Sequence, residues 1–303
     1  MPLKSKPQAN PKSGEPGWMK RHAVVLYFAL VYLITWGGIL SVVGPEALRR
    51  ALLGEGFAFE TFERGLIAFC VMFAVPSIIG VSLTAIVDGG EGLRDLVSRM
   101  RRWRVGARWY AVALLTTPLL LTAVLLALSL LSPVFLPGIL TANDRAALLM
   151  QGVAIGLLAG FFEEIGWTGF AVPRLLRRHG IFATGLIVGT LWGVWHFMAD
   201  LWGASSSYGV LWVPHFLLFV VSVMAYRVLM VWVYEHTMSL LLMQLMHALY
   251  SGTLWVLGPA EVSSAQDLLY SVLFAAALWV LVATVANAQG RDFFRRSLQR
   301  QVT

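Results

Sequence analysis

The chain has 303 residues, of which 58% are hydrophobic and only 13% are charged. Soluble domains carry about 25% charged residues, so this composition excludes an ordinary soluble protein and indicates an integral membrane protein. The single cysteine, Cys70, excludes an intramolecular disulfide and belongs to no zinc-binding pattern.

The first 20 residues are rich in Pro, Lys and Ser and contain no apolar run, which is typical of a disordered segment. The apolar run that follows is too long for the core of a signal peptide, and no cleavage site closes it. We therefore predict a disordered cytoplasmic tail over 1–20 and a single transmembrane domain over 21–303.

Long apolar runs recur along the rest of the chain. About 20 apolar residues cross a bilayer as a helix, and a helix satisfies its own backbone hydrogen bonds inside lipid. The sequence therefore predicts an all-α, polytopic membrane protein, a bundle of eight transmembrane helices. We expect the spans at about 22–44, 66–88, 109–132, 147–172, 181–201, 209–233, 238–257 and 266–288.

The basic residues are distributed unevenly between the connecting segments. If the eight spans alternate in direction, all but four of the 23 Lys and Arg residues fall on one side. The exceptions are Arg49, Arg50, Arg64 and Arg145. Because Lys and Arg concentrate on the cytoplasmic side, we expect both termini in the cytoplasm, with a bacterial plasma membrane as the expected location.

The segment 91–108 combines six arginines with apolar residues at helical spacing. A basic stripe is one feature of nucleic-acid-binding proteins. An amphipathic helix lying on anionic headgroups explains both the charged and the apolar residues. We therefore predict membrane lipids, and no nucleic acid, as partners of this segment.

The stretch GFFEEIGWTGF, over 160–170, places Glu163 and Glu164 inside the fourth span. An ionisable group at such a depth costs ~2.5 kcal/mol or more and usually marks a functional site. Small residues at a spacing of four lead toward Glu164, namely Gly152, Gly156 and Gly160. Such residues let a neighbouring helix approach closely, so we expect Glu164 to be a structural acid and Glu163 the reactive one. A proton relay or a purely structural acid pair is the alternative.

Three histidines lie inside predicted spans, away from the span at the N-terminus: His196, His215 and His247. At 1.5 Å of helix per residue, Glu163, His196 and His247 can meet at a similar depth. His247 lies one turn from Ser251, so these two side chains share a helix face. His215, beside Pro214, is interpreted as an interhelical hydrogen-bond donor.

These residue types favour hydrolysis. A carboxylate can act as general base toward a water molecule, which a neutral imidazole also holds. A second imidazole can donate to the developing oxyanion. Alternatively, Glu163, His196 and His247 can bind zinc with one open position.

The motifs resemble those of the CPBP family, which includes CAAX prenyl proteases of the Ras-converting type and bacteriocin-processing relatives. That family has Glu-Glu-x-x-x-Arg, then Phe-x-x-x-His, then His-x-x-x-Asn or Asp, in an eight-helix core. Here EEIGWT supplies Glu163 and Glu164, WGVWH supplies His196, and HALYS supplies His247 and Ser251. The resemblance covers about 145 to 255.

The resemblance implies an intramembrane endopeptidase that cuts near the C-terminus of a lipidated or membrane-anchored peptide. Glu163 would activate the water, and His196 would help to position it. His247 would stabilise the oxyanion with Ser251, and Glu164 would support them. No cofactor is favoured, although zinc is possible.

Three positions depart from the family pattern: Thr168 replaces Arg, Ser251 replaces Asn or Asp, and Trp192 replaces Phe. Without the arginine, the two acids should share a proton or find another cation, for which Arg227 is the nearest candidate. The changes at Thr168 and Ser251 leave open a non-catalytic relative, acting as a bacteriocin-immunity or scaffold protein. A proton-coupled transporter ranks last because we find no internal repeat.

Overall fold

The computed structural model describes residues 18–53, 55 and 62–294. Most of the predicted tail, over 1–17, and the last basic segment, over 295–303, lie outside these residues. The first helix begins at Trp18, so the last three residues of the predicted tail are helical. All regular secondary structure in the described ranges is helical, which confirms the all-α class.

The principal helices are α1 (Trp18–Val43), α3 (Phe62–Met100), α4 (Ala107–Ser129), α6 (Arg145–Leu158), α9 (Ile181–Trp195), α10 (Phe197–Tyr208), α11 (Trp212–Thr237), α12 (Leu240–Leu257) and α13 (Ser264–Gln289). Shorter elements are α2 (Pro45–Leu52), η1 (Pro133–Phe135), α5 (Gly138–Thr141), η4 (Gly209–Leu211) and η5 (Gly290–Phe293). After α6 the chain stays helical through η2 (Ala159–Glu163), α7 (Glu164–Gly166), η3 (Trp167–Ala171) and α8 (Val172–Leu176).

By length and hydropathy, seven helical segments in the described ranges are suited to crossing a membrane. The predicted fifth span is occupied by α9, a shorter apolar helix of 15 residues. It ends where the chain turns at His196 into α10, and α10 and α11 together form one long apolar segment. The polytopic membrane fold is therefore confirmed, and the predicted count of eight differs by this one short helix.

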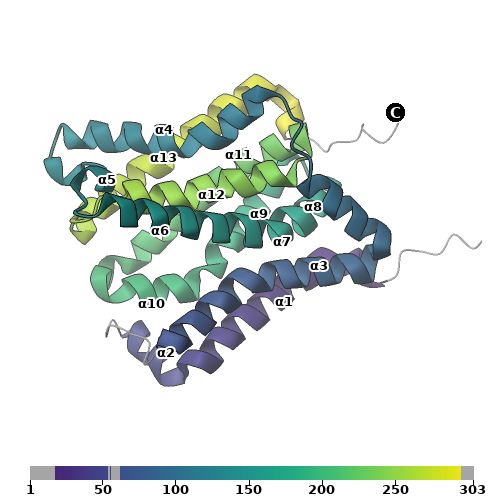
Figure 1. Cartoon of the computed structure of the whole chain (residues 1–303), viewed down its shortest axis with the longest axis horizontal. Helices are drawn as coiled ribbons and strands as arrows, with labels where there is room; N and C mark the ends of the chain where they lie inside the picture. Colours follow the sequence, from purple (N-terminus) through teal and green to yellow (C-terminus); the bar gives the residue numbers. More distant parts are fainter. Residues whose placement is uncertain (1–17, 54, 56–61, 295–303) are drawn as a thin grey trace, which may run out of the picture.

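The bundle has two distinct ends. At one end Arg178 donates to the carbonyl of Arg21 (3.1 Å), and the ring of Phe182 packs against that of Phe293. We call this the basic end, because α1 starts here and α13 ends here, beside most of the described Lys and Arg residues (Figure 1). At the other, basic-poor end, Ser205 donates to the carbonyl of Ala51 and Ser264 donates to that of Ser207.

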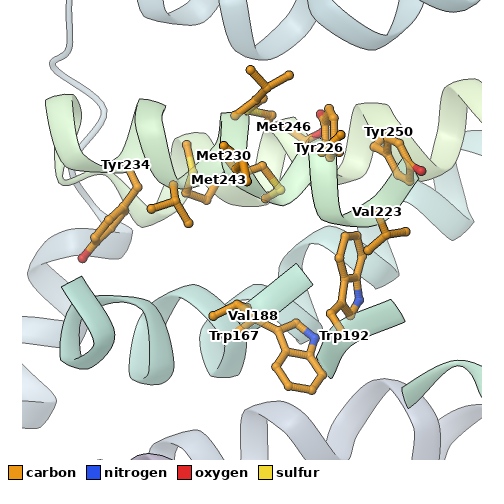
Figure 2. Packing of buried hydrophobic residues seen from close by; sticks show 14 of the residues in the cluster. Trp167, Val188, Trp192, Val223, Tyr226, Met230, Tyr234, Met243, Met246 and Tyr250 are labelled. Atoms are coloured by element: carbon orange, nitrogen blue, oxygen red, sulfur yellow. The ribbon is translucent and has the colours of Figure 1, made fainter. Parts of the chain in front are cut away.

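Helix α11 runs through the centre of the bundle and is buried along most of its length. It packs against α9, whose glycines allow a close approach: a Cβ added at Gly185 would lie closer than 3.0 Å to the backbone of Val228. Figure 2 shows side chains of α11 and α12, such as Met230 and Met243, packed together above Trp167 and Trp192. A helix that is apolar on all sides is expected at such a buried position.

The segment 91–108 differs from its prediction as a helix that lies on headgroups. Helix α3 changes direction at Gly89, whose φ of 65° is a conformation that glycine adopts readily, and continues to Met100. Val97 and Trp103 are exposed, but Leu96 and Arg99 are buried against the bundle. One face of this segment is therefore packed on protein. On that face Arg99 donates hydrogen bonds to Tyr234 and to the carbonyl of Gly169.

Candidate active site

The helix that carries the two acids is in close contact with α12. A Cβ added at Gly156 or Gly160 would lie closer than 3.0 Å to the backbone oxygen of Ala248 or Gln244. The prediction that the glycine stripe is a helix contact is confirmed. Because α12 also carries His247, this contact holds the acids and the histidine side by side.

Two π-helical segments, η2 and η3, flank the short helix α7 at the acids. A π turn contains an extra residue and rotates the following side chains relative to a regular α-helix. Side chains from neighbouring helices bind carbonyl groups of these segments: Gln244 donates to Phe161 (3.1 Å), Ser77 to Phe162, and Arg99 to Gly169 (3.0 Å). Tertiary contacts therefore stabilise the irregular helix.

Glu164 is fully buried in a network of charged and polar groups. Arg227 donates from both Nη atoms to the two carboxylate oxygens, each at 2.8 Å. Nδ1 of His247 lies 2.8 Å from Oε1, and the hydroxyl of Thr168 donates to Oε2. Arg227 thus supplies the positive charge that the family's arginine would supply at position 168. Of the two alternatives, a shared proton or another cation, the structure shows the second for Glu164.

Glu163 is also buried, but its partners are neutral. The indole Nε1 of Trp192 donates to Oε2 at 2.9 Å, and that of Trp167 donates to the same oxygen at 3.2 Å. Figure 2 shows the two indoles near each other below α12. Neither donor was predicted from the sequence, although the position of Trp167 one turn after Glu163 was an available signal.

Both histidines are held through Nδ1. Nδ1 of His196 lies 2.9 Å from the carbonyl oxygen of Trp192, which only accepts, so Nδ1 carries the proton. The carboxylate of Glu164 orients His247 in the same way. In each neutral ring Nε2 is therefore the unprotonated nitrogen.

Four of the five predicted catalytic residues line one cavity of about 370 Å³: Glu163, His196, His247 and Ser251. Apolar side chains, including Met72, Phe73, Phe219 and Leu254, form much of the remaining wall. Glu164, the fifth, is not part of the lining and contacts the cavity only through Nδ1 of His247. Side chains from three helices, Glu163, His196 and His247, therefore line the same cavity.

His215 lies outside this cavity. Its ring nitrogens are 3.5 Å from Asp200 and 3.4 Å from Asp267, and its ring packs against that of Tyr208 at a tilt. It therefore joins α10, α11 and α13 at the basic-poor end, in agreement with its interpretation as an interhelical contact.

The residues of the zinc alternative, Glu163, His196 and His247, all line this cavity. In the part of the chain that the structure describes, no three His, Cys, Asp or Glu side chains are grouped closely enough to hold a metal ion. Glu163, His196 and His247 share a cavity but do not form such a group. The choice between a metal-free and a zinc-dependent reaction therefore stays a prediction.

Fold and site together define a polytopic all-α membrane protein with a buried acid and histidine centre. Residues 145–253 match the family model described as type II CAAX prenyl endopeptidase Rce1-like. Over 178 residues, the chain is 28% identical to CAAX prenyl protease 2 from Methanococcus maripaludis. The aligned region covers 57% of this chain and 60% of that relative. The resemblance predicted over about 145 to 255 is therefore confirmed, and the family match contains all five predicted site residues.

Proposed function

We propose that the chain is an intramembrane endopeptidase that hydrolyses a peptide bond near the C-terminus of a lipidated or membrane-anchored peptide. The observation that carries this proposal is the cavity shared by Glu163, His196, His247 and Ser251. The family match over the same residues supports the reaction class, and the name of the relative supports the substrate class.

In the proposed reaction, a water molecule lies between Oε1 of Glu163 and Nε2 of His196. The two indoles hold Oε2, which leaves Oε1 directed to the water. Glu163 takes one proton as the water oxygen bonds to the scissile carbonyl carbon. When the carbon–nitrogen bond breaks, the same carboxyl group transfers this proton to the leaving amine.

The carbonyl oxygen becomes an oxyanion during the attack and needs hydrogen-bond donors. The hydroxyl of Ser251 supplies one donor. Nε2 of His247 supplies the second when its ring carries both protons, and the contact of Nδ1 with Glu164 orients the ring. Arg227 holds the carboxylate of Glu164 in place for this role.

The test is single-turnover cleavage of lipidated peptides by the purified chain in liposomes. Glu163→Gln keeps the size of the side chain and removes the base. Since a general base contributes roughly 10²- to 10⁴-fold, cleavage should fall by about that factor while the protein still folds. Glu164→Gln should mainly lower the unfolding temperature, and Glu46→Gln, at an exposed position outside the cavity, is the matched control.

Each other outcome has a defined meaning. Cleavage by Glu163→Gln at the wild-type rate would remove Glu163 as the base. Loss of wild-type activity on chelation, restored by zinc, would replace the metal-free reaction by a zinc-dependent one. If the wild type cleaves nothing yet confers a phenotype that Glu163→Gln retains, the non-catalytic relative is the correct interpretation.

A further inference from the structure

The cavity shared by the acid and the histidines contains a phenol that has no part in the proposed reaction. Tyr250 lines this cavity from α12, together with His247 and Ser251. It lies three residues after His247 and directly before Ser251, and residues three or four apart share a helix face. The side chain is 4% exposed, so its hydroxyl is surrounded by protein and by the cavity.

The hydroxyl of Tyr250 is free to bind a ligand in the cavity. Among the described residues, no group accepts a hydrogen bond from it, and burial is the one influence on its ionisation. Neighbouring Tyr226 differs, because its hydroxyl donates to the carbonyl of Met246 at 2.7 Å. The hydroxyl of Tyr27 also has no partner among the described residues, but it is sealed inside the bundle, whereas that of Tyr250 is not.

Aromatic neighbours hold the ring of Tyr250 in place. It stacks on the ring of Tyr226, with 4.3 Å between the centroids and 26° between the planes. Figure 2 shows the hydroxyl of Tyr250 directed away from Tyr226. The indole of Trp192, which donates to Glu163, lies 6.3 Å from the same ring. A donor that is fixed before the substrate binds needs no reorganisation during the reaction.

The side of the cavity formed by α12 has a short donor where the family pattern has a longer one. Ser251 stands in place of Asn or Asp, and its hydroxyl is attached directly to Cβ. Nε2 of His247 donates only when the ring carries both protons. A phenol keeps its proton near neutral pH and reaches further from the helix backbone than a serine hydroxyl.

We propose that the hydroxyl of Tyr250 donates a hydrogen bond to the scissile carbonyl oxygen as this oxygen becomes the oxyanion. Tyr250 is then a further catalytic residue, the third donor beside His247 and Ser251. This inference rests on the proposed function, because it assigns a donor to the oxyanion of that reaction. The phenol keeps its own proton throughout, so Glu163 still takes the proton of the water and transfers it to the leaving amine.

The first measurement is the cleavage rate of Tyr250→Phe, which keeps the stacked ring and removes the hydroxyl. Loss of one oxyanion donor lowers kcat by about 10²- to 10³-fold where it has been measured. Because two other donors remain here, kcat should fall by roughly 10- to 100-fold, with KM unchanged. Tyr270→Phe is the matched control, since Tyr270 is a buried tyrosine on α13 that does not line this cavity. It should cleave at the wild-type rate.

The second measurement is binding, which requires no catalysis. Two S-farnesyl-cysteine peptides of identical sequence carry either a phosphinate or a reduced amide in place of the scissile amide. The phosphinate has the oxygens of the tetrahedral intermediate, whereas the reduced amide has no oxygen at this position. Tyr250→Phe should bind the phosphinate roughly tenfold more weakly than the wild type does, and the reduced amide equally well.

Equal weakening of both peptides would overturn the proposal, because it would show that the phenol shapes the cavity without meeting the oxygen. Wild-type affinity of Tyr250→Phe for the phosphinate would overturn it too, as would a wild type that does not distinguish the two peptides. Melting curves in detergent identify misfolded variants, and the conserved ring makes Tyr250→Phe the mildest change available.

The two proposals fail separately. Cleavage by Tyr250→Phe at the wild-type rate, with Glu163→Gln inactive, would remove the role of Tyr250 and leave the proposed function intact. If the wild type cleaves no peptide, the proposed function fails, and the binding of the phosphinate still decides whether Tyr250 meets the oxygen.

Discussion

At the scale of the residue, Glu163 and Glu164 are neighbours in sequence with different surroundings. Adjacent residues on a helix point about 100° apart, so they meet different partners. Glu164 is neutralised by Arg227, whereas Glu163 has no ion pair among the described residues and accepts only from indoles. An acid without a counter-ion beside a cavity is suited to taking a proton from water, which is the role proposed for Glu163.

Trp192 provides a direct test of that arrangement. Trp192→Phe removes one of the two indole donors to Glu163. It introduces phenylalanine, the residue that the family pattern has at this position. A hydrogen bond to a charged group contributes about 1.5–3 kcal/mol, so the cleavage rate should fall by roughly 10- to 100-fold. The fall should appear in kcat rather than in KM.

Trp232→Phe is the control, because Nε1 of Trp232 is buried and has no hydrogen-bond partner among the described residues. It should leave the rate unchanged. Equal rates for Trp192→Phe and the wild type would show that the indole does not position the base.

Arg227 is the second residue with a specific expected outcome. Arg227→Met leaves Glu164 buried without its cation, and breaking a buried ion pair costs about 3–5 kcal/mol. The unfolding temperature in detergent should therefore fall strongly. Arg227→Lys should recover only part of the loss, since lysine cannot bind both carboxylate oxygens in the same fork. Wild-type melting of Arg227→Met would contradict the assigned role.

At the scale of the element, the important feature is the irregular helix from α6 to α8. The sequence predicts one regular transmembrane helix here. In the structure the same region, Arg145–Leu176, is one apolar membrane segment, but its helix is irregular. The two π segments within it depend on Ser77, Arg99 and Gln244, which come from other helices. A local pattern carries no information about such partners, so the sequence did not predict these segments.

The contact between this helix and α12 leads to a stability prediction. Gly160→Ala places a Cβ closer than 3.0 Å to the backbone of α12, where it cannot be accommodated without a shift. Overpacking of this kind costs about 1–3 kcal/mol, so the melting temperature and the cleavage rate should both fall.

Gly37→Ala is the matched control, because Gly37 lies inside α1 with open space around its Cα. Alanine favours a helix interior over glycine by up to ~1 kcal/mol, so this variant should melt at or above the wild-type temperature. Equal melting of Gly160→Ala and Gly37→Ala would show that the α12 contact tolerates a larger residue.

At the scale of the whole molecule, the two ends of the bundle differ in charge. Described basic residues from 20 to 21, 94 to 108, 174 to 178 and 291 gather at one end, as the alternating spans predicted. We expect reporter fusions at residues 20 and 300 both to give a cytoplasmic signal. An extracytoplasmic signal from either fusion would overturn the predicted topology.

The sequence by itself determined the features that depend on local composition. Long apolar runs predict spans wherever they occur. Glu163, His196 and His247 were predicted as site residues because ionisable side chains are rare inside such runs. Only the tertiary structure decided which groups these residues meet. Arg227 and His247 lie 63 and 83 positions from Glu164, and Trp192 lies 29 positions from Glu163. The cavity was decided in the same way, because its lining comes from side chains of several helices that no single segment brings together.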